Sequence, residues 1–214
     1  MTALAAAPHE SKARFVQAAS QLIRGKGYGA TTVDDLCAAA GLTKGSFFHH
    51  FDSKQALALA AAEHFAESAD ARFANAPYRK LADPLARLLG YVDFRRTILR
   101  GELSNYTCLL GTMVQETYDT HPALRRACER HISGHAASLI ADIAAAKKRY
   151  APHARWGIEG LAMYTQATIQ GAFILAKARQ GPEIADECLA HLRRYLVLLF
   201  NPGPKGRKTR SIEP

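Results

Sequence analysis

The sequence predicts an all-α protein in which a small N-terminal helical domain precedes a larger helical one. Apolar residues recur at three- and four-residue steps along almost every long segment, the spacing of one buried helix face. Capping residues precede many of these segments, and glycine or proline follows them. With 214 residues and 48% hydrophobic content, the chain is long enough to bury a substantial core.

Composition and charge narrow the class of protein. The net charge of +9 favours a polyanionic partner such as nucleic acid. The longest apolar runs fall short of the roughly 20 residues that cross a bilayer, and the N-terminus lacks a signal pattern, so we expect a cytoplasmic protein with no membrane partner. The cysteines are scattered without a CxxC pair, which is typical of a reducing compartment: Cys37, Cys108, Cys128 and Cys188.

The first two expected helices are bounded by glycine. The first covers residues 10–25 with one buried stripe that includes Phe15, and Gly25 and Gly27 end it. Thr31 or Thr32 caps a short second helix, which ends at Gly41, a residue suited to the left-handed conformation.

A third helix, residues 44–50, follows after only a short turn. Thr43 is its expected cap, and Phe47 and Phe51 lie four residues apart, so they hold the helix to its support. Two short helices joined by a glycine-containing turn form a helix-turn-helix, whose second member enters the major groove of DNA. Three side chains of that recognition helix are then expected to face outward: Lys44, Ser46 and His49.

Further helices fill the rest of the chain. Asp52 or Ser53 caps a long helix that reaches about Asn75, and Asp83-Pro84 opens another. The segment 101–105 breaks the pattern, and a helix is expected from about Leu109 to Tyr118. His121-Pro122 opens a long helix that ends near Tyr150, and the last two helices cover roughly 155–179 and 182–200.

These segments predict three regions. Residues 1–54 are expected to form the helix-turn-helix domain, with residues 1–9 disordered, and residues 55–201 a larger helical domain. Residues 202–214 form a flexible tail whose basic residues are either solvated or an accessory DNA contact: Lys205, Arg207, Lys208 and Arg210.

The segment TTVDDLCAAAGLTKGSFFHHFDSKQAL, residues 31–57, resembles the signature of the TetR/AcrR family of transcriptional regulators. The resemblance implies about nine helices, a homodimer formed by the last two (roughly 155–200), and an inducer pocket in the C-terminal domain. It thus implies that residues 55–201 are an effector-sensing and dimerisation domain. We therefore expect a regulator at the nucleoid, a repressor rather than an activator, with neither enzymatic activity nor a cofactor.

The resemblance also implies which residues contact DNA. Thr32 and Lys54 match positions that contact phosphates, and five residues lie on the recognition helix or at its start: Thr43, Lys44, Gly45, Ser46 and His49. Phe48 stands where the family usually has a tyrosine whose hydroxyl bonds a phosphate, and His49 is the candidate to replace that donor. His50 is expected to pack the helix junction. The expected target is double-stranded DNA, a near-palindromic operator with half-sites about 34–36 Å apart or a multiple of this.

Two modes of effector sensing are open. The stretches 106–111 and 171–177 resemble the NemR-like, electrophile-responsive subgroup, which implies a reactive Cys108 with Lys177 beside it. An ammonium group nearby would favour the thiolate. The alternative is that Cys108 is a small apolar residue at a helix start and Lys177 a solvated charge, with a reversible inducer bound in an apolar pocket among aromatic residues and Met113: Tyr91, Phe94, Tyr106, Trp156 and Tyr164.

Two other functions have weaker support. Cys128, His131 and His135 share one helical face with metal-ligand spacing, but no fourth ligand is evident, and we interpret them as polar surface residues. The GKGYG segment, residues 25–29, lacks the Lys-Ser/Thr ending of a phosphate loop and is interpreted as a helix-ending turn. A helix-turn-helix scaffold that binds only protein would show no salt-sensitive affinity for DNA.

Overall fold

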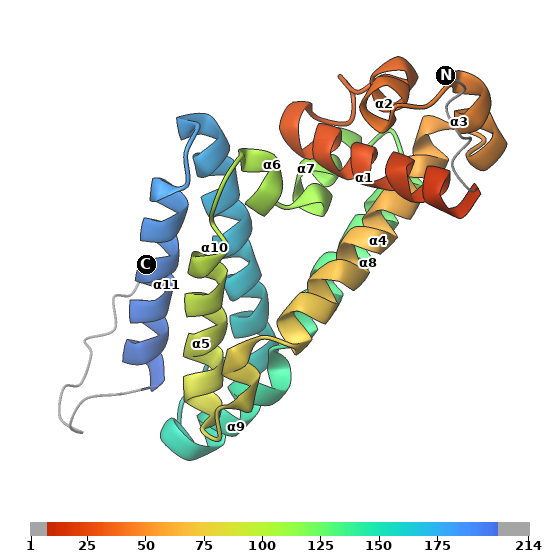
Figure 1. Cartoon of the computed structure of the whole chain (residues 1–214). Coiled ribbons are helices and arrows are strands. Elements are labelled where there is room, and N and C mark those ends of the chain that lie inside the picture. The colour runs from red at the N-terminus through yellow and green to blue at the C-terminus, as the bar shows by residue number, and fades with distance from the viewer. Residues whose placement is uncertain (1–7, 201–214) are drawn as a thin grey trace.

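The computed structural model describes residues 8–200, and the described part is entirely helical, as predicted (Figure 1). None of its helices is both long and apolar enough to cross a membrane. The predicted basic tail lies outside the described residues. The helices are α1 (Pro8–Lys26), α2 (Val33–Ala40), α3 (Lys44–His50), α4 (Lys54–Ala74), the 3-10 helix η1 (Pro77–Lys80), α5 (Pro84–Thr97), α6 (Leu103–Tyr106), α7 (Leu109–Thr117), α8 (Pro122–Ala137), α9 (Ile140–Tyr150), α10 (Ile158–Arg179) and α11 (Glu183–Phe200).

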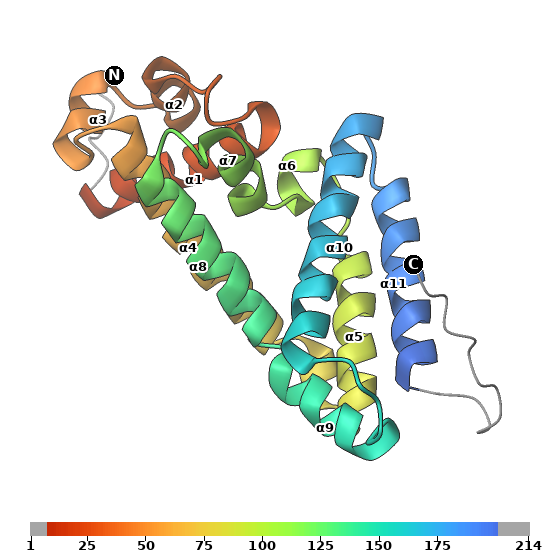
Figure 2. The same cartoon turned by 180° about the vertical axis from the view of Figure 1, so that it is seen from behind.

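The helices form two groups joined by a long pair. Helices α1, α2 and α3 gather at one end of the molecule, and α5, α9, α10 and α11 at the other (Figure 1). Helices α4 and α8 run side by side between the two groups, as both views show (Figure 2). Helices α6 and α7 lie against α1, so the N-terminal group has a second connection to the rest of the chain.

Local capping fixes where the helices begin. Thr32, Thr43 and Ser53 each accept a hydrogen bond from the backbone N–H three residues on, which satisfies a donor that the first turn would otherwise leave free. Asp83 does the same for α5, with Pro84 at its first position. Gly41 ends α2 with φ +60°, where a side chain would strain the backbone. These cap predictions are confirmed.

Two buried clusters make up the core. The N-terminal cluster surrounds Phe15, Phe47 and Leu57, and is completed by residues of α7 and α8: Leu109, Leu110, Met113, Leu124 and Cys128. The C-terminal cluster lies among η1, α5, α9, α10 and α11. Because the N-terminal core includes side chains from α7 and α8, the first three helices depend on the rest of the chain for their packing.

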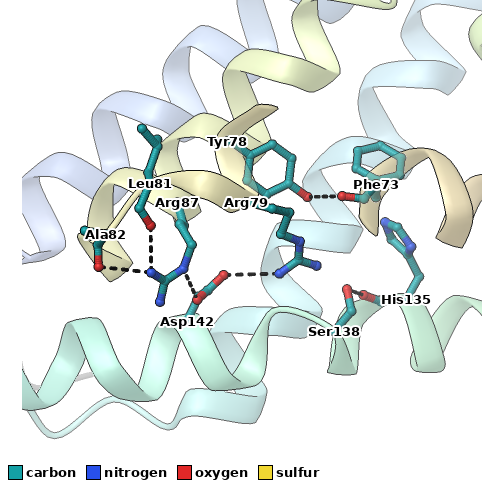
Figure 3. Close-up of polar contacts among 9 residues, drawn as sticks. All are labelled: Phe73, Tyr78, Arg79, Leu81, Ala82, Arg87, His135, Ser138 and Asp142. Atoms are coloured by element: carbon teal, nitrogen blue, oxygen red, sulfur yellow. Dashed lines mark hydrogen bonds and ion pairs between the residues drawn. The ribbon is translucent and has the colours of Figure 1, made fainter. Parts of the chain in front are cut away.

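The predicted long helix from 121 to about 150 is wrong, because the chain breaks between α8 and α9. Ser138 N–H bonds Gly134 O, but Leu139 N–H bonds Ala136 O, which tightens the last turn. The Ser138 hydroxyl donates to the carbonyl of His135 at 2.7 Å and so competes for the helix backbone (Figure 3). Together with η1 and α6, which the sequence did not predict, this break raises the nine implied helices to eleven α-helices and one 3-10 helix within residues 8–200.

A buried carboxylate holds the far end of the molecule together. Asp142 of α9 is bound by the Arg87 guanidinium at 2.7 Å and by that of Arg79 at 3.4 Å (Figure 3). The Arg87 guanidinium also donates to the carbonyls of Leu81 and Ala82. These bonds join η1 and the start of α5 to α9.

We expect Asp142→Ala to lower the free energy of unfolding by about 2 kcal/mol, because it leaves two partly buried guanidinium groups without their anion. Urea denaturation measures the change. The control is Asp34→Ala, which removes an exposed ion pair with Lys44 and should have little effect. Equal decreases in the free energy of unfolding in the two variants would contradict a stabilising role for Asp142.

Candidate nucleic-acid interface and ligand cavity

Helix α3 presents one face to solvent. Thr43, Lys44, Gly45 and His49 are exposed, Ser46 is half-buried, and Phe48 is 57% exposed. The helix lies at the end of the molecule farthest from α9 (Figure 1). The residues predicted on the recognition helix therefore share one accessible surface.

The opposite face of α3 is held by aromatic contacts. Phe47 is fully buried and meets the Phe15 ring edge-on at 5.5 Å between centroids. Phe51 also contacts Phe15, and the His50 ring lies 6.5 Å from it, as expected for a residue that packs the junction. Burial, together with the neighbouring His49 and Lys12, lowers the pKa of His50. Helix α1 thereby fixes the orientation of α3.

Polar contacts set the start of α2. Thr32 and Asp35 form a capping box, in which each side chain accepts from the other residue's backbone N–H. The Lys26 ammonium, 2.7 Å from Asp35, and the Thr32 groups hold the pKa of that carboxyl well below its ordinary value. Lys44 pairs with Asp34 at 2.8 Å, but both are exposed, so the pair opens at little cost.

Two glycines near the turn have different structural requirements. Gly41 needs its positive φ, so the fold itself requires glycine there. At Gly45, an added Cβ would lie 3.7 Å from Thr43 Oγ1, an ordinary van der Waals contact. The protein's own packing therefore does not explain the missing side chain at the exposed position 45.

The turn between α1 and α2 is held from two sides. The Lys54 ammonium donates to the carbonyls of Tyr28 and Thr31, each at 3.0 Å, and lies 4.2 Å from the centre of the Tyr28 ring. The Glu116 carboxylate of α7 accepts from the Gly29 N–H at 2.7 Å. Lys54, predicted to contact phosphate, is thus bound to the backbone of its own domain in this structure.

Helices α4 and α8 are joined by two histidines one turn apart. His131 Nε2 lies 3.1 Å from the Glu63 carboxylate, and His135 Nδ1 lies 3.4 Å from that of Asp70. Both acidic residues belong to α4. The two contacts set the register of one helix along the other.

An apolar cavity of about 60 Å³ lies between α4, the segment 106–110, α8 and α10. Tyr106 and Cys108, both predicted in effector sensing, line it. Met113 instead lies fully buried in the N-terminal core, and Trp156 packs against Phe200 near the α9–α10 connection. Apolar side chains of this kind serve equally as core, which explains why the sequence pattern did not separate these two.

Cys108 and Lys177 line a second, smaller pocket together. The Cys108 sulfur caps α7 by accepting from the Gly111 N–H at 3.4 Å. The Lys177 ammonium donates to Thr112 Oγ1 at 2.6 Å, and burial lowers its pKa. The structure therefore brings these two predicted residues to one pocket.

A buried polar network lies beside the cavity, and Tyr91 is the only one of its members that the sequence analysis linked to effector sensing. The Tyr91 hydroxyl accepts from Arg95 Nε at 3.2 Å and from Gln166 Nε2 at 2.9 Å. Arg95 Nη2 lies 2.8 Å from His135 Nε2, so that nitrogen accepts and the neutral imidazole carries its proton on Nδ1. Burial, with Arg95 nearby, lowers the pKa of His135 to about 4. A polar residue within an apolar stripe, such as Gln166 on α10, was the available sequence signal.

The metal-ligand spacing in α8 has a different explanation. Cys128 is fully buried in the N-terminal core, where burial raises the pKa of its thiol to about 12. Its interpretation as a surface residue is therefore wrong, and His131 and His135 likewise face α4 rather than solvent. Among residues 8–200, no cluster of three or more potential ligands could hold a metal ion.

An exposed recognition helix on a capped helix-turn-helix, with a cavity in a separate helical group, defines a DNA-binding transcriptional regulator. The model for "Bacterial regulatory proteins, tetR family" matches residues 15–61, and that for "Tetracyclin repressor-like, C-terminal domain" matches residues 84–192. The chain belongs to the TetR family, whose members regulate transcription and are not enzymes.

Known proteins resemble the chain over most of its length. The HTH-type transcriptional repressor DhaR of a Mycobacterium species is 25% identical over 181 residues, which cover 82% of this chain and 86% of DhaR. The crystal structure of a TetR transcriptional regulator from Chloroflexus aurantiacus is 27% identical, with a TM-score of 0.78 over 89% of this chain and 96% of that one.

The reduced form of Escherichia coli NemR is another structural neighbour. Its TM-score is 0.74 at 22% identity, over 87% of this chain and 96% of that one. At this level of identity the similarity establishes a shared fold and no more.

His135 predicts an acid-sensitive fold. Its folded-state pKa of about 4 lies below the ordinary 6.5, so the unfolded chain binds the proton more tightly, and stability present above pH 6.5 is lost as the pH falls toward 4. Between pH ~7 and ~5, the free energy of unfolding of the wild type should fall by about 2 kcal/mol more than that of His135→Gln, a variant that keeps a hydrogen-bond acceptor for Arg95. Urea denaturation at the two pH values measures this, and parallel losses would contradict it.

Proposed function

We propose that the chain is a homodimeric repressor that binds a near-palindromic operator and leaves it when a small molecule occupies the C-terminal domain. The observation that carries the DNA-binding half of this proposal is the exposed face of α3, where the fold leaves position 45 open without needing glycine there. A missing side chain at such a position lets DNA approach the helix closely.

Each residue of that face has a role in this proposal. Lys44 exchanges its exposed partner Asp34 for a phosphate, and Thr32, Thr43 and Ser46 offer hydroxyl groups at the starts of α2 and α3. Phe48 and His49 are the exposed rings on the last turn of α3. Phe48 makes an apolar contact, such as one with a thymine methyl, and His49 supplies the hydrogen-bond donor that phenylalanine lacks.

Lys54 contributes in a different way. Its ammonium bonds two carbonyls of the α1–α2 turn, so it fixes α2 and the start of α4 relative to each other. A phosphate contact by the same group would be made while it holds this turn, because an ammonium has three donors.

The dimer forms through α10 and α11. These helices carry large apolar side chains that are 41–71% exposed in the single chain: Met163, Tyr164, Ile174, Leu175, Tyr195 and Leu198. Nothing lies within 4 Å of a Cβ added at Gly160 or Gly171 of α10, which leaves room for a second backbone to approach. An exposed apolar surface of this kind is typical of a protein interface.

Repression requires communication between the two halves, and α4 is the proposed route. It begins at the Lys54 bonds to the α1–α2 turn and continues past the cavity residues Phe65, Ala66 and Ala69. Occupancy of the cavity that shifts α4 changes the spacing of the two recognition helices in the dimer, so that they no longer reach successive major grooves.

DNA binding is tested with the purified protein and duplex DNA from beside its own gene. We expect salt-sensitive binding by the wild type. Gly45→Ala should keep or raise stability, by up to about 1 kcal/mol, because alanine favours the helix, but should weaken binding about tenfold or more. Fluorescence anisotropy and thermal unfolding give the two readouts. Unchanged affinity in Gly45→Ala would remove the main support, and no binding by wild type to any tested duplex would overturn the regulator proposal.

The dimer is tested separately. Ile174→Glu places a charge on the proposed interface and should yield a monomer in size-exclusion chromatography with light scattering. Leu81→Glu is the control, because Leu81 is 44% exposed and lies outside α10 and α11. A dimer that survives Ile174→Glu and further charges at Leu175 and Leu198 would place the interface elsewhere.

A second mode of sensing, by thiol chemistry, is favoured by the pocket that Cys108 and Lys177 share. It predicts that N-ethylmaleimide releases the wild type from its operator and leaves the Cys108→Ser variant bound. Release of both proteins alike, or of neither, argues against a Cys108 switch. Mass spectrometry of the treated protein identifies the modified cysteine.

A further inference from the structure

A groove of about 420 Å³ is lined by residues of α1, α4, the end of α5 and the segment 105–107. Arg24 of α1, Arg72 of α4 and Arg95 of α5 line it, with His64 of α4 nearby. None of the described residues that line the groove is an aspartate or a glutamate. Arginines from three helices thus line one space, and no acidic residue is among the described residues that line it.

These arginines lack the partners that arginines have at other helix junctions of the molecule. Arg87 is bound to Asp142, and Arg96 forms two bonds to Asp186. Arg24, by contrast, donates only to the carbonyls of Ser20 and Thr107. Within residues 8–200, Arg72 makes no hydrogen bond or ion pair.

The electrostatics of the groove favour an anion. Burial lowers the pKa of Arg24, and the like charge of Arg72 adds to this effect, whereas Cys108 acts in the opposite direction. Arg95 donates to the Tyr91 hydroxyl and to the His135 ring, neither of which carries a negative charge. A carboxylate or phosphate between these groups would accept charge-assisted hydrogen bonds.

The groove continues into the apolar cavity. Phe65, Ala69, Arg95, Tyr106 and Thr107 line both spaces. Beyond them the cavity wall includes the apolar residues Leu110 and Phe173. Its one acidic member among the described residues is Asp70, whose carboxylate lies 3.4 Å from His135 Nδ1. The Tyr106 hydroxyl is buried and has no hydrogen-bond partner within the described part of the chain, an uncommon and costly state for a polar group.

We propose that the effector of this regulator is a small organic anion, with its acidic group bound by Arg24, Arg72 and Arg95 and its apolar body in the cavity beside Phe65 and Tyr106. The identity of the ligand as an effector rests on the proposed regulatory function, whereas binding of the anion does not. Because the three arginines belong to α1, α4 and α5, the acidic group ties the helix that supports α3 to the C-terminal half.

Calorimetric titration of the DNA-free protein tests the charge requirement. The probes are benzoate and its neutral, nearly isosteric amide, benzamide, at constant ionic strength. We expect benzoate to bind about tenfold or more tightly than benzamide, and Arg72→Gln and Arg24→Gln each to remove about tenfold of that affinity. Arg126→Gln, an exposed substitution on α8 outside the groove, is the matched control and should bind as the wild type does.

Two further probes identify the acidic group and the need for an apolar body. Tighter binding of phenyl phosphate than of benzoate would assign a phosphorylated ligand, and the reverse a carboxylate; both support an anion site. Inorganic phosphate should bind more weakly than phenyl phosphate, because it leaves the cavity empty.

Three results would overturn the proposal: equal affinity for benzoate and benzamide, unchanged affinity in both groove variants, or no binding of any anionic probe at millimolar concentration. Operator binding by the ligand-free protein is measured in parallel. If DNA binds but the anions do not, the anion site is refuted and the proposed regulatory function is not. If the anions bind but DNA does not, the anion site is supported and the regulatory function is refuted.

Discussion

The position of the helix-turn-helix depends on the backbone of one turn, residues 27–31. The ammonium of Lys54 binds two of its carbonyls from α4, and the carboxylate of Glu116 binds one of its N–H groups from α7. Gly27 has φ +92°, so the tight turn itself requires glycine. Because α4 and α7 each contribute a residue to the cavity wall, Phe65 and Leu110, a rearrangement of the cavity can reach this turn through both helices.

The features predicted correctly are the local ones. A cap such as Thr43 or Asp83 acts on a backbone group three residues away, so its chemistry can be recognised in a short segment. The same holds for Phe47, whose spacing from Phe51 marks one helix face. The break at Ser138 was missed because serine is tolerated within helices, and only the packing of Leu139 and of Asp142 against Arg87 shows why the chain turns there.

The sequence predicted the residues of the DNA-binding site more completely than those of the cavity. The residues predicted to contact DNA lie within one short segment, Thr32 to Lys54, whose motif predicts the cap of α2, the whole of α3 and the start of α4. The cavity combines α4, α8 and α10 with the segment 106–110, and its polar members Arg95, His135 and Gln166 are more than thirty residues apart in the chain. Trp156 and Met113 were named because large apolar residues favour pockets, although the same residues equally favour cores.

Charge compensation distinguishes the two ends of the molecule. Within the group of α5, α9, α10 and α11, Asp142 and Asp186 neutralise arginines that belong to neighbouring helices. In the groove between α1 and α4, no acidic side chain in the wall does so. The ion pairs stabilise a fixed structure. In the groove, by contrast, a bound anion would neutralise the charge of the arginines.

The paired contacts between α4 and α8 limit how the long helices can move. His131 and His135, one turn apart on α8, meet Glu63 and Asp70 of α4. A small axial slide would therefore strain both pairs and restore neither. The next arrangement with comparable side-chain interdigitation lies about one helical turn away, ~5.4 Å along the axis. Motion between these helices is therefore expected to be stepwise, with two discrete registers in place of a continuous range, or to be a pivot that keeps the register unchanged.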